Sequence, residues 1–369
     1  MTARATGSQE ERSFRVSAPE GAGRGFLVLE DGTVFSGRAV GAPGRAFGEA
    51  VFTTAMTGYQ EVVTDPSYAE QIVCFTAPMV GNYGVAPARS ESERVHARAV
   101  VMRCASGRAW SRWLAARGIV ALDEVDTRSL VLHLRERGAM RAAAVAGEAS
   151  VAEVLRRVRA EPPMTGRALV AGVSTERVYS LGHGPVRIAV VDYGSKRSLL
   201  GRLCSAGARV TVYPHDVEAA DVLASRPDAV VLSNGPGDPA ALDDEVRVVS
   251  ELVGRVPLLG ICLGHQLLAR AAGLGTRKLP FGHRGANHPV LECATGRVLV
   301  TAQNHGFAVA GESREVTHVS LYDGTVEGLR LHGLHAASVQ FHPEAAPGPH
   351  DALPLLEGWV AQLRHAAAA

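Results

Sequence analysis

Short apolar runs alternate with amphipathic segments through the second half of the chain. The runs Val186 to Val191, Arg209 to Tyr213, Ala229 to Leu232 and Pro257 to Ile261 are rich in β-branched and aliphatic residues. A helical pattern from Lys196 to Ala206 separates the first two runs. Strands that alternate with helices in this way predict an α/β domain with a doubly wound, mostly parallel sheet. In such sheets, ligands bind beyond the carboxyl ends of the strands.

The first half of the chain has a less regular pattern of apolar positions. Phe26 to Glu30 and Thr33 to Phe35 are separated by a turn-forming Asp-Gly pair, which predicts two strands joined as a hairpin. Further strands are expected at Glu49 to Thr54 and Gln71 to Thr76, and helices at Ala109 to Arg117, Thr127 to Arg137 and Val151 to Arg159. This mixture predicts a first domain of mixed α/β type.

Shifts in composition divide the chain into four parts. Residues 1–25 are polar and glycine-rich and contain no apolar stretch of the signal-peptide kind, so we expect a disordered tail there. Pro162-Pro163 and the polar stretch up to Gly184 indicate a linker at residues 161–185. The expected domains are therefore residues 26–160 and residues 186–366.

The bulk composition narrows the possible functions. The chain has 369 residues, 46% of them hydrophobic, so two domains can each bury a core. A formal net charge of +1 argues against nucleic acid or a membrane surface as a partner. The chain also has no run of about 18 apolar residues that would predict a membrane span. The five cysteines are widely spaced and form no Cys-x-x-Cys pair, which favours a reducing, cytoplasmic compartment.

Cys262 carries the clearest chemical signal. It lies between Gly260 and Gly264, directly after an apolar strand-like run and before a helical one. Flanking glycines allow the sharp strand-to-helix turn of a nucleophile elbow, and a helix N-terminus favours the thiolate. Far downstream, His342 and Glu344 are two residues apart at an expected strand end, so both side chains leave the same face. This arrangement suits a base and the carboxylate that orients it.

Other residues have a simpler structural interpretation. The four remaining cysteines are expected to be small core residues. His283, His288 and His305 lack the spacing of a zinc site, so no metal is expected. His265 follows the elbow and is expected to be structural. Trp110 and Trp113, at helical spacing, are expected to pack rather than to bind a ligand. The four remaining cysteines are Cys74, Cys104, Cys204 and Cys293.

A glycine-rich loop follows another of the expected strands. Asn234 to Pro239 contains two glycines that would expose backbone amides. Beside Cys262, the amides of this loop and of Leu263 could form an oxyanion hole. Taken alone, the loop is weak evidence, because turn statistics favour a plain turn by about twofold. It lacks the Gly-Lys-Ser/Thr ending of a phosphate-binding loop.

Together these segments resemble the class I, triad-type glutamine amidotransferase domain, through Gly260 to Gln266, Ser233 to Pro239 and His342-Pro343-Glu344. Longer segments in both domains are similar to the small, glutamine-hydrolysing subunit of carbamoyl-phosphate synthase. In the second domain these are Phe281 to Pro289, Thr301 to Val309 and Ala345 to Asp351; in the first they are Leu29 to Gly32, Met56 to Glu61, Asp65 to Tyr68 and Gly81 to Gly84.

The resemblance implies a role for each matching residue. Cys262 would be the nucleophile, His342 the general acid and base, and Glu344 the residue that orients His342. The residues implied to bind glutamine are Ser67, Gly235, Gly237, Leu263, Gln266, Asn304, Gly306 and Phe307.

The resemblance also implies a heterodimer. No cofactor is expected on this chain, because ATP and Mg²⁺ would bind to a large synthetase subunit. That partner would combine the released ammonia with bicarbonate to form carbamoyl phosphate, for pyrimidine and arginine biosynthesis.

Two departures from the family pattern leave alternatives open. Ser198 stands where the family usually has asparagine, and the segment between Val101 and Asp123 is shorter than in the family. Because the first domain is the expected docking face, the shorter segment bears on partner affinity. Two alternative interpretations stay open: a glutaminase that serves another synthetase, and a non-catalytic paralogue.

Overall fold

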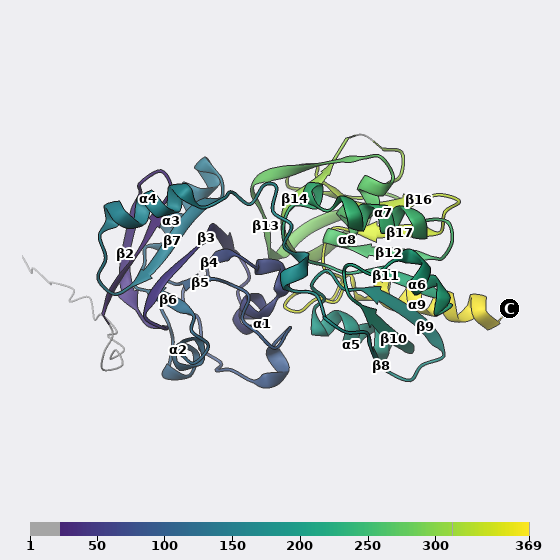
Figure 1. The fold of residues 1–369 in the computed structure, drawn as a ribbon, viewed down its shortest axis with the longest axis horizontal. Helices are drawn as coiled ribbons and strands as arrows, with labels where there is room; N and C mark the ends of the chain where they lie inside the picture. The colour runs from purple at the N-terminus through teal and green to yellow at the C-terminus, as the bar shows by residue number, and fades with distance from the viewer. Residues whose placement is uncertain (1–22, 312, 369) are drawn as a thin grey trace, which may run out of the picture.

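The computed structural model describes residues 23–311 and 313–368 and shows two domains side by side (Figure 1). The predicted disordered tail falls mostly on residues 1–22, which lie outside the described residues. Regular structure begins at Arg24, close to the expected start at Phe26. Each domain has its own hydrophobic core.

The first domain is a closed barrel with the strand order β1-β2-β6-β5-β4-β3-β7. β1 and β2 form the expected hairpin, in which Val28 lies opposite Val34. β7 closes the barrel because it pairs with both β1 and β3. The strands are β1 (Arg24–Leu29), β2 (Val34–Ala39), β3 (Gly44–Thr53), β4 (Gln71–Phe75), β5 (Ala99–Val101), β6 (Val120–Asp123) and β7 (Met140–Ala146).

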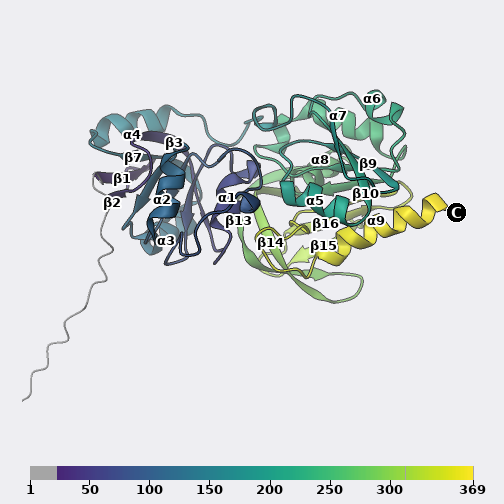
Figure 2. The ribbon, with the colours of Figure 1, turned by 90° about the horizontal axis from the view of Figure 1, so that it is seen from below.

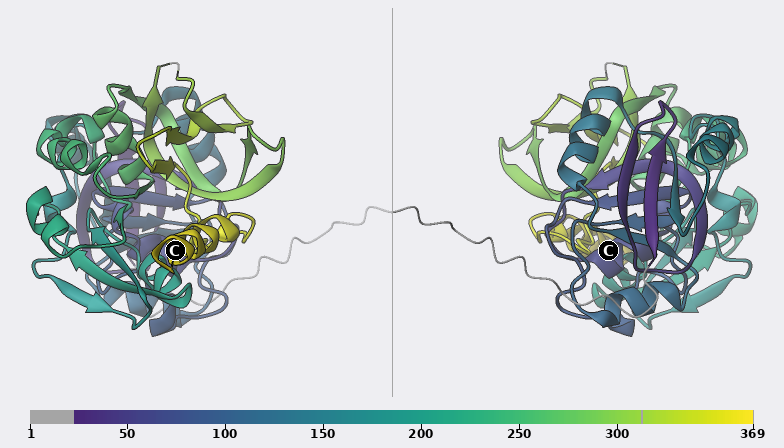
Figure 3. Two further views of the ribbon diagram at one scale, coloured as in Figure 1. Left: turned by 90° about the vertical axis from the view of Figure 1, so that its right-hand side faces the viewer. Right: turned by 90° about the vertical axis from the view of Figure 1, so that its left-hand side faces the viewer.

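Helices cover this barrel, and the right-hand view of Figure 3 faces this domain. Leu130 and Leu134 are buried against Leu122 of β6. Trp110 is fully buried and its ring stacks on Trp113 at 5.4 Å, in agreement with the expected packing role. The helices are α1 (Tyr59–Thr64), α2 (Arg108–Ala115), α3 (Thr127–Arg137) and α4 (Val151–Ala160), with short 3₁₀ turns η1 (Pro66–Tyr68) and η2 (Pro87–Arg89).

The second domain contains a 10-stranded sheet in the order β14-β13-β15-β16-β17-β12-β11-β9-β10-β8. β10, β9, β11, β12 and β17 pair in parallel, which confirms the predicted doubly wound core. The parallel strands are β9 (Val186–Val191), β10 (Ala208–Tyr213), β11 (Ala229–Leu232), β12 (Leu258–Ile261) and β17 (Ala336–Val339).

Helices cover both faces of this parallel core. Val230 packs toward Val249 on one face, whereas the next residue, Val231, packs toward Leu203 and Leu356 on the other. The helices are α6 (Ala219–Ala224), α7 (Asp243–Leu252) and α8 (Leu263–Ala271) on the first face, and α5 (Arg197–Ser205) and α9 (Leu353–Ala368) on the second. Along the described ranges, no helix has the length and apolarity needed to cross a bilayer.

Antiparallel strands extend the sheet at both ends, and the apolar pattern did not predict them. β8 (Tyr179–Leu181) lies inside the predicted linker and pairs with β10 at one edge. At the other end a long hairpin of β13 (Gly275–Glu292) and β14 (Val298–Ala310) lies beside β15 (Val316–Ser320) and β16 (Val326–Leu331). Glycines, histidines and register shifts interrupt the alternation of apolar and polar residues in β13, so its sequence does not show the pattern that predicts a strand.

Strand β13 also joins the two domains, and Figure 2 shows both α1 and β13 at their junction. The backbone amide of Thr54 donates to the carbonyl of Arg284 over 3.1 Å. Nearby, the Lys278 ammonium lies 2.6 Å from the Glu49 carboxylate, which is buried in the junction. These contacts hold the barrel against the sheet on the side where Cys262 is found.

Candidate active site

Cys262 occupies a strained backbone position between β12 and α8. Its φ of 55° and ψ of −103° lie in a region that side-chain-bearing residues rarely adopt. A Cβ added to Gly264 would lie 2.2 Å from the Leu232 carbonyl oxygen, and one added to Gly260 would lie 2.6 Å from the Gly264 oxygen. Only glycine fits at these two positions, so the predicted sharp strand-to-helix turn is confirmed.

His342 and Glu344 lie in the segment that follows β17, the neighbour of β12 in the sheet. The two side chains are hydrogen-bonded, with 2.7 Å between His342 Nδ1 and Glu344 Oε1. The His342 backbone amide donates to the Ala302 carbonyl on β14 over 2.9 Å, which anchors the segment. Both side chains are almost completely buried, as is Cys262.

Lys196 completes a buried ionic chain that the sequence interpretation missed. Its ammonium donates to Glu344 Oε1 over 2.9 Å, and both side chains are at most 4% exposed. Burial alone would raise the pKa of Glu344, but the charges of Lys196 and His342 hold it well below its usual range. Lys196 directly precedes α5, beyond the carboxyl end of β9, where its position could have suggested a role.

The charge of His342 is set by the same neighbours. Burial favours the neutral ring, but the carboxylate of Glu344 and the sulfur of Cys262 outweigh it and raise the pKa of His342. The site therefore favours a protonated His342, held in place by Glu344 and, through Glu344, by Lys196.

The sulfur of Cys262 is held by two further contacts. It donates a weak hydrogen bond to the Asn304 carbonyl over 3.6 Å, and the amide of Gln340 donates to it over 3.7 Å. A small cavity of about 30 Å³ adjoins it. Seven of the eight residues predicted to bind glutamine line this cavity: Ser67, Gly235, Gly237, Gln266, Asn304, Gly306 and Phe307.

The eighth predicted residue, Leu263, does not line the cavity. Its side chain is buried in the core of the second domain, so only its backbone amide is available for the predicted oxyanion contact. Gln266 is at the cavity, but its amide nitrogen is already engaged. It donates to the Phe307 carbonyl over 2.7 Å and to Gln340 over 3.0 Å, which fixes the loop that carries Phe307.

The first domain reaches the same cavity through η1. Asn234 donates from its side-chain amide to the Ser67 hydroxyl over 3.0 Å, and Asn304 donates to the Asp65 carboxylate over 2.9 Å. Asp65 also accepts a hydrogen bond from the Ser67 backbone amide. Asp65 and Asn234 were not among the predicted site residues, because their contacts depend on how the domains meet.

His265 lies close to the elbow but faces away from this chemistry. It is fully buried, and its Nδ1 lies 2.8 Å from the Ser338 hydroxyl. Burial lowers the pKa of His265 to about 3, so the ring stays neutral. The structural role expected for it agrees with these contacts.

Comparisons with known proteins agree with the two-domain architecture. Residues 27–144 match the family described as carbamoyl-phosphate synthase small chain, CPSase domain, and residues 189–361 match glutamine amidotransferase class-I. A carbamoyl phosphate synthase small chain from Xanthomonas campestris pathovar campestris is 46% identical, over 92% of this chain and 98% of that protein. The chain belongs to the carbamoyl-phosphate synthase small chain family.

Two further relatives with the same description cover most of the chain. The protein from Escherichia coli K12 is 44% identical over 91% of this chain and 96% of its own length. The protein from Streptomyces coelicolor is 47% identical over 90% of this chain and 94% of its own length. The resemblance seen in the motifs is thus confirmed, as is the expected amidotransferase class of the second domain.

The close approach at Gly264 generates a first prediction. Gly264→Ala places a methyl group against the backbone of Leu232, so the elbow must shift and the thiol loses its position. We expect a destabilisation of about 1–3 kcal/mol and a large loss of any reactivity of Cys262 toward iodoacetamide. Gly201→Ala, in α5 with open space around it, is the control and should leave both unchanged or slightly raise stability. Equal stability and equal Cys262 reactivity in Gly264→Ala and Gly201→Ala would contradict this account.

A second prediction concerns the only two lysines of the chain, Lys196 and Lys278. Lys196→Met leaves Glu344 buried with one partner fewer, and we expect a loss of about 3–5 kcal/mol in the free energy of unfolding at neutral pH. Because the pKa of Glu344 is lowered on folding, its stabilising contribution is present above its unfolded pKa and is lost as the pH falls. The difference from the parent protein should therefore shrink on acidification.

Denaturant unfolding at a series of pH values measures this effect. Lys278→Met is the matched control, since Lys278 is partly exposed and pairs with Glu49 at the domain junction. Lys278→Met should lower the free energy of unfolding by less than Lys196→Met does, and its effect should depend less on pH. A loss in Lys196→Met no larger than in Lys278→Met would exclude the buried ionic chain as a major stabilising feature.

Proposed function

We propose that this chain hydrolyses glutamine to glutamate and ammonia, with Cys262, His342 and Glu344 acting together. The observation that carries the proposal is the strained Cys262 elbow beside the buried pair of His342 and Glu344. The amidotransferase match of residues 189–361 supports the same chemistry.

The reaction would begin with attack of the Cys262 thiolate on the side-chain amide carbon of glutamine. The backbone amides of Leu263 and Gly235 would stabilise the oxyanion. His342 would protonate the departing ammonia, which leaves a glutamyl thioester on Cys262. Water activated by His342 would then attack the thioester and release glutamate.

Neutral groups from both domains would bind the substrate. Glutamine carries an α-ammonium and an α-carboxylate, and the cavity offers backbone groups of Gly306 and Phe307 together with side chains such as that of Ser67. The Ser67 hydroxyl accepts a hydrogen bond from Asn234, so its own proton is available for the substrate carboxylate. The barrel would thus contribute directly to glutamine binding.

The ammonia would pass to a large synthetase subunit. The relatives' description as small chains of carbamoyl phosphate synthase supports such a partner. That subunit would hold ATP and Mg²⁺ and make carbamoyl phosphate from bicarbonate, for pyrimidine and arginine biosynthesis in the cytoplasm. All five cysteines are free, which is compatible with a reducing compartment.

The nucleophile is tested by Cys262→Ala. We expect glutamine-dependent glutamate release, measured with the large subunit, ATP and bicarbonate, to fall by about 10³-fold or more. Carbamoyl phosphate synthesis from added ammonia should persist, because that step needs no thiol of this chain. Cys293→Ala, at an exposed cysteine, is the control and should keep full activity. Substantial glutaminase activity in Cys262→Ala would eliminate the proposal.

The contribution of the first domain is tested by Ser67→Ala. Loss of one hydrogen bond to a charged substrate group should raise the KM for glutamine by about tenfold and change kcat less. Ser92→Ala, in the same domain but hydrogen-bonded only to backbone carbonyls, serves as the comparison variant. An unchanged KM in Ser67→Ala would remove Ser67 from the substrate site.

A further inference from the structure

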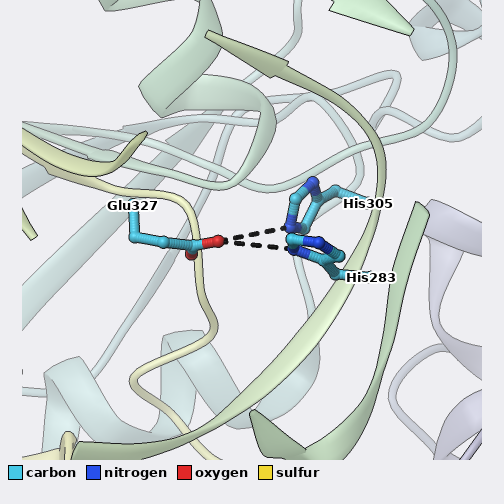
Figure 4. Close-up of side chains that lie close together, drawn as sticks. All are labelled: His283, His305 and Glu327. Atoms are coloured by element: carbon cyan, nitrogen blue, oxygen red, sulfur yellow. Dashed lines mark ion pairs between the residues drawn. The ribbon is translucent and has the colours of Figure 1, made fainter. Parts of the chain in front are cut away.

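Three buried side chains converge outside the proposed catalytic residues. His283 on β13 lies opposite His305 on β14 in the strand register, and Glu327 reaches them from β16 (Figure 4). Each is at most 5% exposed. One ligand atom from each of the three lies within 4.8 Å of the others. Glu327 Oε1 is 3.5 Å from His283 Nδ1 and 3.9 Å from His305 Nε2.

In each of the three side chains, a hydrogen bond to the outer atom determines which atom faces the centre of the cluster. His283 Nε2 lies 3.0 Å from the Asp323 carboxylate, so this nitrogen carries a proton and donates it. His305 Nδ1 lies 2.8 Å from the Phe307 carbonyl, which can only accept, so this nitrogen is also the protonated one. Glu327 Oε2 accepts from the amide of Gln303 over 2.8 Å.

The inward-facing atoms of the neutral rings are therefore lone-pair acceptors, as is Glu327 Oε1. Within the described ranges, no hydrogen-bond donor reaches His283 Nδ1, His305 Nε2 or Glu327 Oε1. Buried polar atoms without partners are costly, and three converging acceptors require a shared positive centre. Outer hydrogen bonds that fix the tautomer of each ring are also typical of histidine ligands in metal sites.

We propose that His283, His305 and Glu327 bind a divalent transition-metal ion of the zinc type. Two imidazoles and one carboxylate are a donor set that suits Zn²⁺, and water would complete the coordination. Metal–ligand bonds of about 2.0–2.1 Å place tetrahedral ligand atoms about 3.4 Å apart. Glu327 Oε1 is within about 0.5 Å of this separation from each ring nitrogen, and all three ligand atoms lie within 4.8 Å of one another, so the side chains would move toward the ion on binding.

A bound ion would link this cluster to the cavity beside Cys262. His305 stands between Asn304 and Gly306, and all three line that cavity. The Phe307 carbonyl that accepts from His305 also accepts from Gln266. The ion would tie β13, β14 and β16 together and hold this loop in place, so it would have a positioning role.

A buried proton is the competing explanation. Burial opposes the charged form of His283, but Glu327 and Asp323 outweigh it and raise the pKa of this ring. A protonated His283 would place a proton between Nδ1 and Glu327. In that case the cluster would need no metal ion, and the experiment below separates the two cases.

The test uses the full-length chain, produced without a polyhistidine tag and stripped with EDTA. Zn²⁺ is titrated in competition with a chromophoric chelator, and Co²⁺ is added separately to record its visible absorption. We expect one Zn²⁺ per chain and Co²⁺ bands of the intensity typical of four- or five-coordinate sites. Zn²⁺ should also raise the thermal unfolding midpoint of the stripped protein.

Three variants locate the site. Glu327→Gln keeps the shape but removes the anionic ligand, and it should lower Zn²⁺ affinity by about 100-fold or more. Asp323→Asn only loosens the orientation of His283 and should lower affinity by about 10- to 100-fold. His288→Asn is the matched control. The His288 ring centroid is 5.4 Å from that of His283, but His288 is not one of the proposed ligands, so we expect the Zn²⁺ affinity of this variant to be unchanged.

Several results would overturn the proposal. Folded parent protein that binds no Zn²⁺, or binds Co²⁺ with the weak spectrum of the aqueous ion, would leave the buried proton as the explanation. Equal Zn²⁺ affinity in the parent and Glu327→Gln would place the ion elsewhere. The Co²⁺ spectrum of the parent decides the question even if a variant fails to fold.

Discussion

The buried ion pair between Lys196 and Glu344 is the interaction on which the rest of the site depends. A charge removed from water is tolerated only when its partners are well placed. Lys196 follows β9, Cys262 follows β12 and Glu344 follows β17, so three strands of the parallel core deliver these groups to one edge. The carboxylate of Glu344 holds His342 and favours its protonated form.

The barrel domain completes this arrangement. Asp65, which caps η1, and Ser67 within η1 are hydrogen-bonded to side chains of the second domain that line or adjoin the cavity. β13 provides the mechanical link, because its backbone and Lys278 both contact β3 or the loop after it. Two family models match successive parts of this chain, and the contacts between the two domains give a physical reason for keeping both in one chain.

Features that depend on neighbouring residues could be predicted from the sequence. The alternation of strands and helices and the glycines around Cys262 gave the parallel core and the elbow, because both follow from local backbone preferences. The two-residue spacing of His342 and Glu344 predicted that they lie together, and they are hydrogen-bonded. The resemblance then added Ser67 and the other residues predicted to bind glutamine.

Features that arise from long-range pairing could not be predicted in this way. Closure of the barrel by β7, the edge strand β8, and the contacts of Lys196 and Asp65 depend on segments far apart in the chain. The cluster of His283, His305 and Glu327 is of the same kind. The histidines lack zinc-type spacing in the sequence, and the spacing could not show the cluster because Glu327 comes from a third strand.

The covalent intermediate tests the central claim most directly. The chain and its large subunit would be mixed with glutamine, quenched in acid within the turnover time, digested and analysed by mass spectrometry. The account predicts a glutamyl group on the peptide that contains Cys262, formed before glutamate is released. Glutamate release with no adduct on that peptide, or with an adduct on another residue, would contradict the account.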